Sequence, residues 1–123
     1  MMMVRDPYSR VLNHRDPWLW VSILLGLALA FVAAYMAILR FRCLGNDNYD
    51  IAFYTRVVWG LAHGDRVNSI VGAHDLGLHF MPVMVLFAPL SYLVSIPHML
   101  LVAQALALGG VVPLLYRAGV HVT

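Results

Sequence analysis

The sequence contains no lysine and no glutamate, so arginine and aspartate carry all of its full charges. Charged residues make up 11% of the 123 residues, whereas soluble domains average about 25%. The formal net charge of +2 is small, and basic residues neither cluster nor alternate with aromatic ones. This pattern excludes nucleic acid as an expected partner.

Cysteine is almost absent as well. Cys43 is the only one, which excludes an intrachain disulfide and leaves the redox compartment undefined. The sequence also lacks a phosphate-binding loop, a serine–histidine–aspartate arrangement and a nucleophile elbow. Local motifs therefore indicate none of the catalytic classes that these signatures define.

Apolar residues are abundant. They make up 62% of the chain, with a mean hydropathy of +0.78, which is typical of a membrane protein. The run 18–39 is uncharged and would form a helix of about 33 Å, enough to cross a hydrocarbon core of about 30 Å. Trp18 and Trp20 stand at its entrance, and Arg40 and Arg42 follow its end. A signal peptide is the alternative interpretation, but the run is longer than a usual signal core.

A stripe of small residues runs along this first apolar segment. Gly26, Ala30 and Ala34 recur every four residues and therefore share one face of a helix. Such a stripe favours close packing against another helix, although alanine is also common in membrane spans without any such role.

Two further apolar runs, 78–96 and 98–116, follow the only long polar stretch. Each has just enough residues to cross a membrane, and a short turn joins them. Pro89 predicts a kink in the first of the two, where neighbouring groups would have to satisfy the freed carbonyl. The sequence therefore predicts an all-α membrane protein with three transmembrane helices, at about 18–39, 78–96 and 98–116.

The polar stretch 40–77 contains one amphipathic segment. Four apolar residues recur there with the period of a helix: Ile51, Tyr54, Val58 and Leu61. Asp47 or Asn48 suits the N-cap, and Gly64 suits the left-handed position after the last turn. We therefore expect an amphipathic interfacial helix at about 48–63 that lies flat on the membrane surface.

Arginine placement gives a weak indication of topology. Three arginines precede the first span and two follow it directly, which favours a cytoplasmic N-terminus. The expected organisation is a polar cytoplasmic segment at 1–17, a single membrane domain at 18–119, and an extracytoplasmic loop at 40–77 within it. The expected location is the inner (plasma) membrane, as a multi-pass protein with membrane lipid as a partner.

Polar residues near the expected membrane face are the candidate site residues. Asp50 lies in the first turn of the predicted helix, where a carboxylate also stabilises the positive end of the helix dipole. His79 lies at the mouth of the second span, where a histidine can equally bond a loop carbonyl. Gln104 lies within the third span, where it can bridge helices or face a ligand. His74, Asp75 and His79 match no standard zinc spacing, so no metal site is predicted.

Several motifs in order resemble a family of prokaryotic predicted membrane proteins of unknown function, which is grouped with the GT-C type glycosyltransferases. The motifs are Tyr49-Asp50-Ile51, Trp59, His63-Gly64, Leu76-Gly77-Leu78-His79-Phe80-Met81-Pro82, Pro89-Leu90 and Gln104-Ala105. The resemblance covers about residues 18–119. The chain departs from the family pattern at Ala52, where glycine is expected, and at Arg56, where glutamine is expected.

The resemblance implies a sugar transferase with a polyprenyl-phosphate-linked sugar as donor. Asp50 occupies the kind of position at which GT-C enzymes carry a general base or a metal ligand, in the first extracytoplasmic loop. A base at the membrane face can deprotonate an acceptor hydroxyl where the lipid presents its sugar. Arg56 and His79 are the candidate contacts to the donor phosphate, with Gln104 as a weaker substrate-binding candidate. The motifs define no cofactor, although a divalent metal is compatible with the position of Asp50.

Family members are several hundred residues long, so we expect this chain to be a truncated member, a fragment or one piece of a split protein. Three spans can hardly enclose a cavity for a lipid donor, and the chain alone is not expected to be active. The alternative hypothesis is a small non-catalytic membrane protein. Such an accessory subunit would pack against other membrane helices or against the remainder of a split protein.

Overall fold

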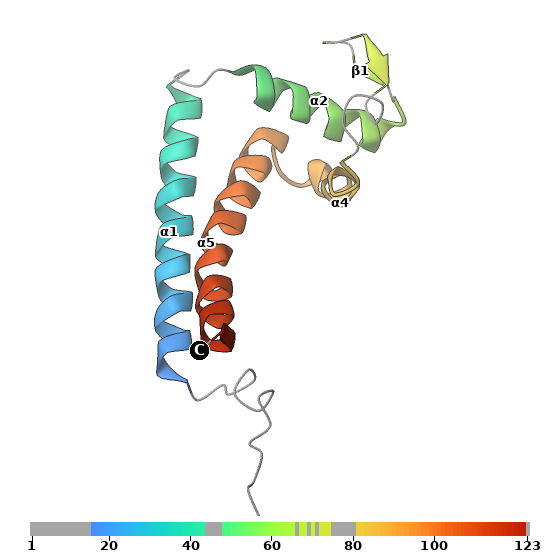
Figure 1. Cartoon of the computed structure of the whole chain (residues 1–123). Helices are drawn as coiled ribbons and strands as arrows, with labels where there is room; N and C mark the ends of the chain where they lie inside the picture. Colours follow the sequence, from blue (N-terminus) through green and yellow to red (C-terminus); the bar gives the residue numbers. More distant parts are fainter. Residues whose placement is uncertain are drawn as a thin grey trace, which may run out of the picture. The chain divides into compact units, whose positions relative to one another are not determined.

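A computed structural model of the chain (Figure 1) describes residues 16–43, 48–65, 67–68, 70, 72–74 and 81–122. Most of these residues are helical. The elements are helix α1 (Pro17–Arg42), helix α2 (Asn48–His63), strands β1 (Val67–Asn68) and β2 (Ala73–His74), helix α4 (Met84–Phe87), the 3₁₀ helix η2 (Pro89–Tyr92) and helix α5 (Ile96–Val122). They form two compact units, one containing residues 16–34 and 104–122 and the other lying within residues 35–103.

Helix α1 matches the first predicted span and extends it slightly at both ends. The Oδ1 atom of Asp16 accepts a hydrogen bond from the N–H of Trp18 at 3.0 Å, which caps the start of the helix, and Pro17 occupies the first helical position. Arg40 and Arg42 lie in the last turn, where cations stabilise the negative end of the dipole. By length and composition, α1 is a candidate membrane span.

Within the first unit, the α1 and α5 segments run antiparallel and side by side (Figure 1). Their backbones approach closely at Gly26 and Gly109: a Cβ atom added to either glycine would meet the carbonyl oxygen of the other. A Cβ atom on Gly109 would also lie 2.7 Å from the Cβ of Ala30. The predicted packing role of the small-residue stripe is therefore confirmed at Gly26 and Ala30, both of which are buried.

Each unit contains one contact that fixes the antiparallel order of the two long helices. In the first unit, the hydroxyl of Tyr116 donates a hydrogen bond of 2.7 Å to the Oδ2 atom of Asp16. In the second unit, the rings of Phe41 and His98 meet edge to face with centroids 5.5 Å apart. The start of α1 thus meets the end of α5, and the end of α1 meets the start of α5.

Helix α5 contains the predicted third span and is also a candidate membrane span, over Ile96–Val120. Its first turn is set by Ser95, whose carbonyl accepts the N–H of Met99 at 3.0 Å. Pro97 fits this turn because the first helical N–H groups need no partner within the helix.

The predicted second span, 78–96, is not a continuous helix where the structure describes it. Residues 81–95 form only the four-residue helix α4 and the four-residue 3₁₀ helix η2. Pro82 and Pro89 cannot donate a backbone hydrogen bond, and the hydroxyl of Ser91 competes for the carbonyl of Ala88 at 2.6 Å. The expected kink at Pro89 is instead the boundary between two short helices.

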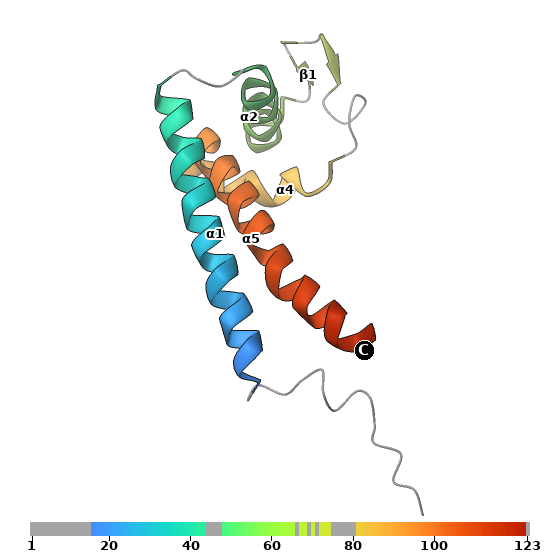
Figure 2. The ribbon, with the colours of Figure 1, turned by 60° about the vertical axis from the view of Figure 1, so that its left-hand side comes forward.

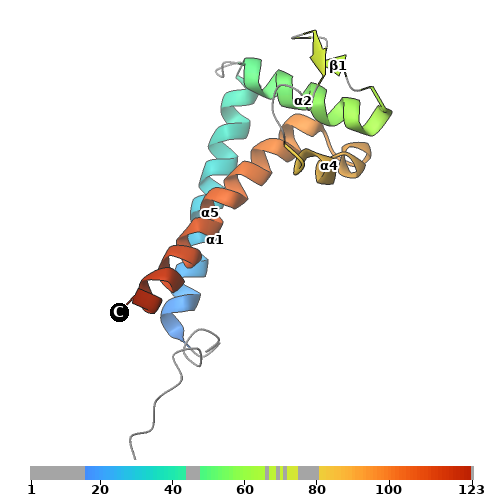
Figure 3. The same ribbon diagram turned by 45° about the vertical axis from the view of Figure 1, so that its right-hand side comes forward.

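Helix α2 is the predicted amphipathic helix, from Asn48 to His63. Gly64 follows with a φ of 75°, as predicted for the residue after the last turn. The helix packs against α4, η2 and β1 (Figures 2 and 3). Its side chains Phe53, Val57 and Val58 are buried, Val58 completely. A large part of its apolar face is therefore covered by protein.

The contact between the two glycines yields a stability prediction. We expect Gly109→Ala to destabilise the helix pair by about 1–3 kcal/mol, because the added methyl group forces two backbones apart. The matched control is Gly110→Ala, where an added Cβ meets no atom within 4 Å. The midpoint of unfolding in mixed micelles, followed by circular dichroism, measures both variants. Equal midpoints for the two variants would contradict the close approach.

Candidate functional site

Asp50 is presented by the first turn of α2. Its side chain is exposed, and no hydrogen-bond or ion-pair partner for it lies among the residues that the structure describes. The connection from α1 to α2, residues 44–47, lies outside those residues. The carboxylate is thus accessible to an incoming hydroxyl group.

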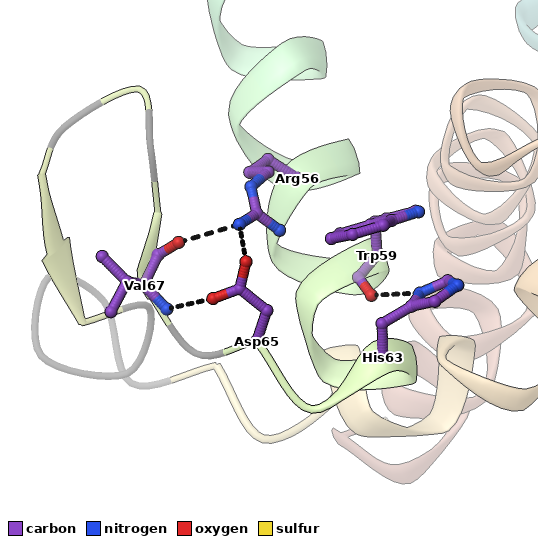
Figure 4. A network of polar contacts seen from close by, with 5 residues as sticks. All are labelled: Arg56, Trp59, His63, Asp65 and Val67. Atoms are coloured by element: carbon purple, nitrogen blue, oxygen red, sulfur yellow. Dashed lines mark hydrogen bonds and ion pairs between the residues drawn. The ribbon is translucent and has the colours of Figure 1, made fainter.

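Arg56 lies six residues further along α2 and is the centre of a polar network (Figure 4). Its Nη2 atom donates hydrogen bonds to the Oδ2 atom of Asp65 and, at 3.0 Å, to the carbonyl oxygen of Val67. The Oδ1 atom of Asp65 accepts the N–H of Val67 at 3.2 Å. Asp65 therefore links the middle of α2 to the start of β1, and the left-handed turn at Gly64 brings it back to Arg56.

This network lowers the pKa of Asp65 below its usual value. The main cause is the hydrogen bond from Arg56, followed by the hydrogen bond from the backbone N–H of Val67. The side chain of Arg56 is 17% exposed and that of Asp65 is 48% exposed. The carboxylate is therefore ionised at neutral pH and remains partly exposed to water.

Aromatic rings continue the network along the same helix. The guanidinium carbon of Arg56 lies 4.8 Å from the ring centroid of Trp59, and the ring of His63 stacks on Trp59 at 4.2 Å with an interplanar angle of 16°. The Nδ1 atom of His63 lies 2.8 Å from the carbonyl oxygen of Trp59. The spacing of these residues, i, i+3 and i+7, is a signal in the sequence that could have indicated this row of contacts.

Tyr92, the last residue of η2, connects this row of aromatic side chains on α2 to the apolar segment 81–95. Its ring centroid lies 5.8 Å from that of His63, and its hydroxyl donates a hydrogen bond of 2.8 Å to the carbonyl of Ala62. Carbonyls in the last turn of a helix have no partner within the helix, so this bond satisfies one of them. The end of α2 is thereby fixed to η2.

The structure does not gather the candidate residues into one constellation among the residues that it describes. Asp50 and Arg56 are six residues apart on α2, which places them on different faces of the helix. Gln104 is exposed on α5, in the other compact unit. His79 lies outside the described residues. Sequence reasoning missed Asp65 as the partner of Arg56, because only the turn at Gly64 brings the two together.

Among the described parts of the chain, no group of three or more histidine, cysteine, aspartate or glutamate side chains could hold a metal ion. Asp50 provides one carboxylate there, whereas divalent metal sites use several ligands.

Two long apolar helices with a polar segment between them define an α-helical membrane protein. The model of the family described as "Predicted membrane protein (DUF2079)" matches residues 40–122, more than half of the chain, and the protein belongs to this family. No curated protein and no solved structure matches the chain. The resemblance seen in the sequence is thus confirmed for a family of predicted membrane proteins.

The Arg56–Asp65 pair gives a prediction on pH. Because the pKa of Asp65 is lowered in the folded protein, the pair contributes stability above the ordinary carboxyl pKa of about 3.9 and loses it as the pH falls through the lowered value. In Arg56→Gln, we expect the titration midpoint of the Asp65 carboxyl carbon in ¹³C NMR to rise towards that ordinary value. Arg117→Gln, which removes an equal charge from α5, is the control. An unchanged midpoint in Arg56→Gln would show that Arg56 does not lower the pKa of Asp65.

Proposed function

We propose that the chain is part of a GT-C type glycosyltransferase that transfers a sugar from a polyprenyl-phosphate donor at the outer face of the inner membrane. Three features support the proposal. The family is one of membrane proteins, two helices are long and apolar enough to cross a bilayer, and the polar segment follows the first of them directly. In this proposal α2 lies at the membrane surface and the N-terminus is cytoplasmic.

The exposed carboxylate of Asp50 is the observation that carries the proposal. As a general base, it takes the proton of an acceptor hydroxyl while that oxygen attacks the anomeric carbon of the sugar. The bond from this carbon to the phosphate oxygen breaks, and polyprenyl phosphate leaves with the electron pair. A base at the start of α2 is well placed for this step, because α2 lies at the membrane surface in this proposal. The phosphate and sugar of a lipid-linked donor also stay close to that surface.

Among the residues that the structure describes, Arg56 is the candidate contact to the donor phosphate. Its guanidinium is held in place by Asp65, Val67 and the ring of Trp59. A phosphate would have to share the guanidinium with the carboxylate of Asp65, since charge-assisted bonds to both use the same planar fork. His79 and Gln104 remain predicted substrate contacts.

The base role is tested by Asp50→Asn at the matching position of a family member of several hundred residues. We expect transfer of radiolabelled sugar from a polyprenyl-phosphate donor to fall by about 10²–10⁴-fold, the usual contribution of a general base. The matched control is the change matching Tyr49→Phe, which removes a hydroxyl from the neighbouring exposed side chain. Unchanged transfer in the asparagine variant would remove Asp50 from the catalytic role.

The orientation is tested with the single cysteine. Cys43 is exposed and directly follows α1, so it reports the side of the membrane on which α2 lies. We expect a membrane-impermeant maleimide to label Cys43 in spheroplasts, with Cys43→Ser as the unlabelled control. Labelling only after the membrane is permeabilised would place α2 in the cytoplasm and overturn the proposed orientation.

A non-catalytic accessory subunit is the second candidate function. The observation that favours it is the apolar surface of α1, where Leu24, Leu25 and Phe31 are exposed and available to other membrane helices. The Asp50→Asn experiment separates the two functions, because packing in the membrane does not depend on an exposed carboxylate.

A further inference from the structure

The two long helices restrict where the chain between them can go. Contacts at each end set them antiparallel: Asp16 with Tyr116 in one unit, and Phe41 with His98 in the other. If both helices cross the membrane, the end of α1 and the start of α5 lie on the same side of it. The chain between them must therefore leave and return on one side, so it crosses the bilayer either twice or not at all.

Residues 81–95, here called the wedge, are the apolar part of this connecting chain. No charged residue occurs between Asp75 and Arg117. The wedge does not form one continuous helix, because α4 and η2 have four residues each. A helix that crosses a core of about 30 Å needs about 20 residues, and neither element approaches that length.

The wedge also exposes several large apolar side chains along its length. Leu93 is 82% exposed and Leu86 is 69% exposed, and four further residues are about half exposed: Val83, Val85, Leu90 and Val94. A patch of this kind on a protein normally marks an interaction site with another protein or with a membrane. The patch runs directly into α5, which begins at Ile96 and is itself a candidate span.

Many polar groups of the wedge form hydrogen bonds within it or with α2. Backbone N–H groups bond to carbonyls three residues earlier at Met84, Val85, Leu86, Ala88, Ser91 and Leu93. The two prolines have no N–H to satisfy. The hydroxyls of Ser91 and Tyr92 donate to the carbonyls of Ala88 and Ala62. Internal pairing of this kind is a requirement for backbone that enters a hydrocarbon environment, where no water is available.

We propose that the wedge inserts into one leaflet of the lipid bilayer and leaves it again at Ser95 on the same side, as a re-entrant anchor. Its partner is the boundary between lipid headgroups and acyl chains, into which Leu86 and Leu93 project. The wedge then holds α2 at the membrane surface through the bond from Tyr92 to Ala62. This assignment does not depend on sugar transfer and differs from a membrane span at 78–96.

Insertion is tested by the accessibility of nitroxide labels in vesicles of phosphatidylethanolamine and phosphatidylglycerol. Leu86→Cys and Leu93→Cys are labelled in the full chain carrying Cys43→Ser, with Val67→Cys on β1 as the exposed control. We expect the ratio of collision with oxygen to collision with a nickel chelate to be several-fold higher at Leu86 and Leu93 than at Val67. A ratio equal to that at Val67 would show that the labels at positions 86 and 93 lie in water. Low collision rates with both reagents would show that a protein partner covers them. Either result would overturn the proposal.

The return to the same side is tested with two proteins. One is the native chain, whose only cysteine is Cys43, and the other carries Cys43→Ser together with Ser95→Cys. Both positions are exposed. An impermeant maleimide added to one side of oriented vesicles should label both proteins from the same side. Labelling of Ser95→Cys from the opposite side would show that the segment crosses the membrane, and no labelling from either side would show that it does not emerge at Ser95. Both outcomes contradict the re-entrant course.

Discussion

The close approach of α1 and α5 at Gly26 and Gly109 is the constraint on which the rest of the topology depends. Lipid tails are as apolar as leucine, so two membrane helices gain little from burying apolar side chains against each other. Contact of backbones without intervening side chains is what makes their association favourable. If these antiparallel helices both cross the bilayer, the segment between them has to begin and end on one side of it.

The second unit contains the chain that connects the two long helices. The connecting chain contains both an amphipathic helix and an apolar segment. Helix α2 buries Phe53, Val57 and Val58 and packs against α4, η2 and β1, so much of its apolar surface is covered by protein. The exposed apolar surface lies instead on the segment that leads into α5. The polar network and the exposed apolar surface thus lie on two elements that the hydrogen bond of Tyr92 joins.

The long helices and α2 could be predicted from the sequence, because the residues of each segment by themselves determine that it forms a helix. Charge-free length predicts α1 and α5, the apolar period predicts α2, and Gly64 predicts its end. The rules failed for 78–96, where hydropathy and length suggested a span. There Pro82, Pro89 and Ser91 change the backbone hydrogen bonding in a way that a hydropathy count does not include. The Arg56–Asp65 pair was missed for another reason: nine residues separate the partners, and the pairing depends on a turn.

The same pair bears on how Arg56 can act. At neutral pH the carboxylate of Asp65 is ionised, so an approaching phosphate meets an arginine whose charge is already compensated. The pair gives Arg56 a structural role, in which it fixes the start of β1 beside α2, and a donor phosphate would have to share the guanidinium with Asp65. A donor phosphate held from another direction could still gain from the guanidinium fork. Asp65 would then determine how strongly Arg56 binds, and its charge would oppose binding at every pH above its lowered pKa.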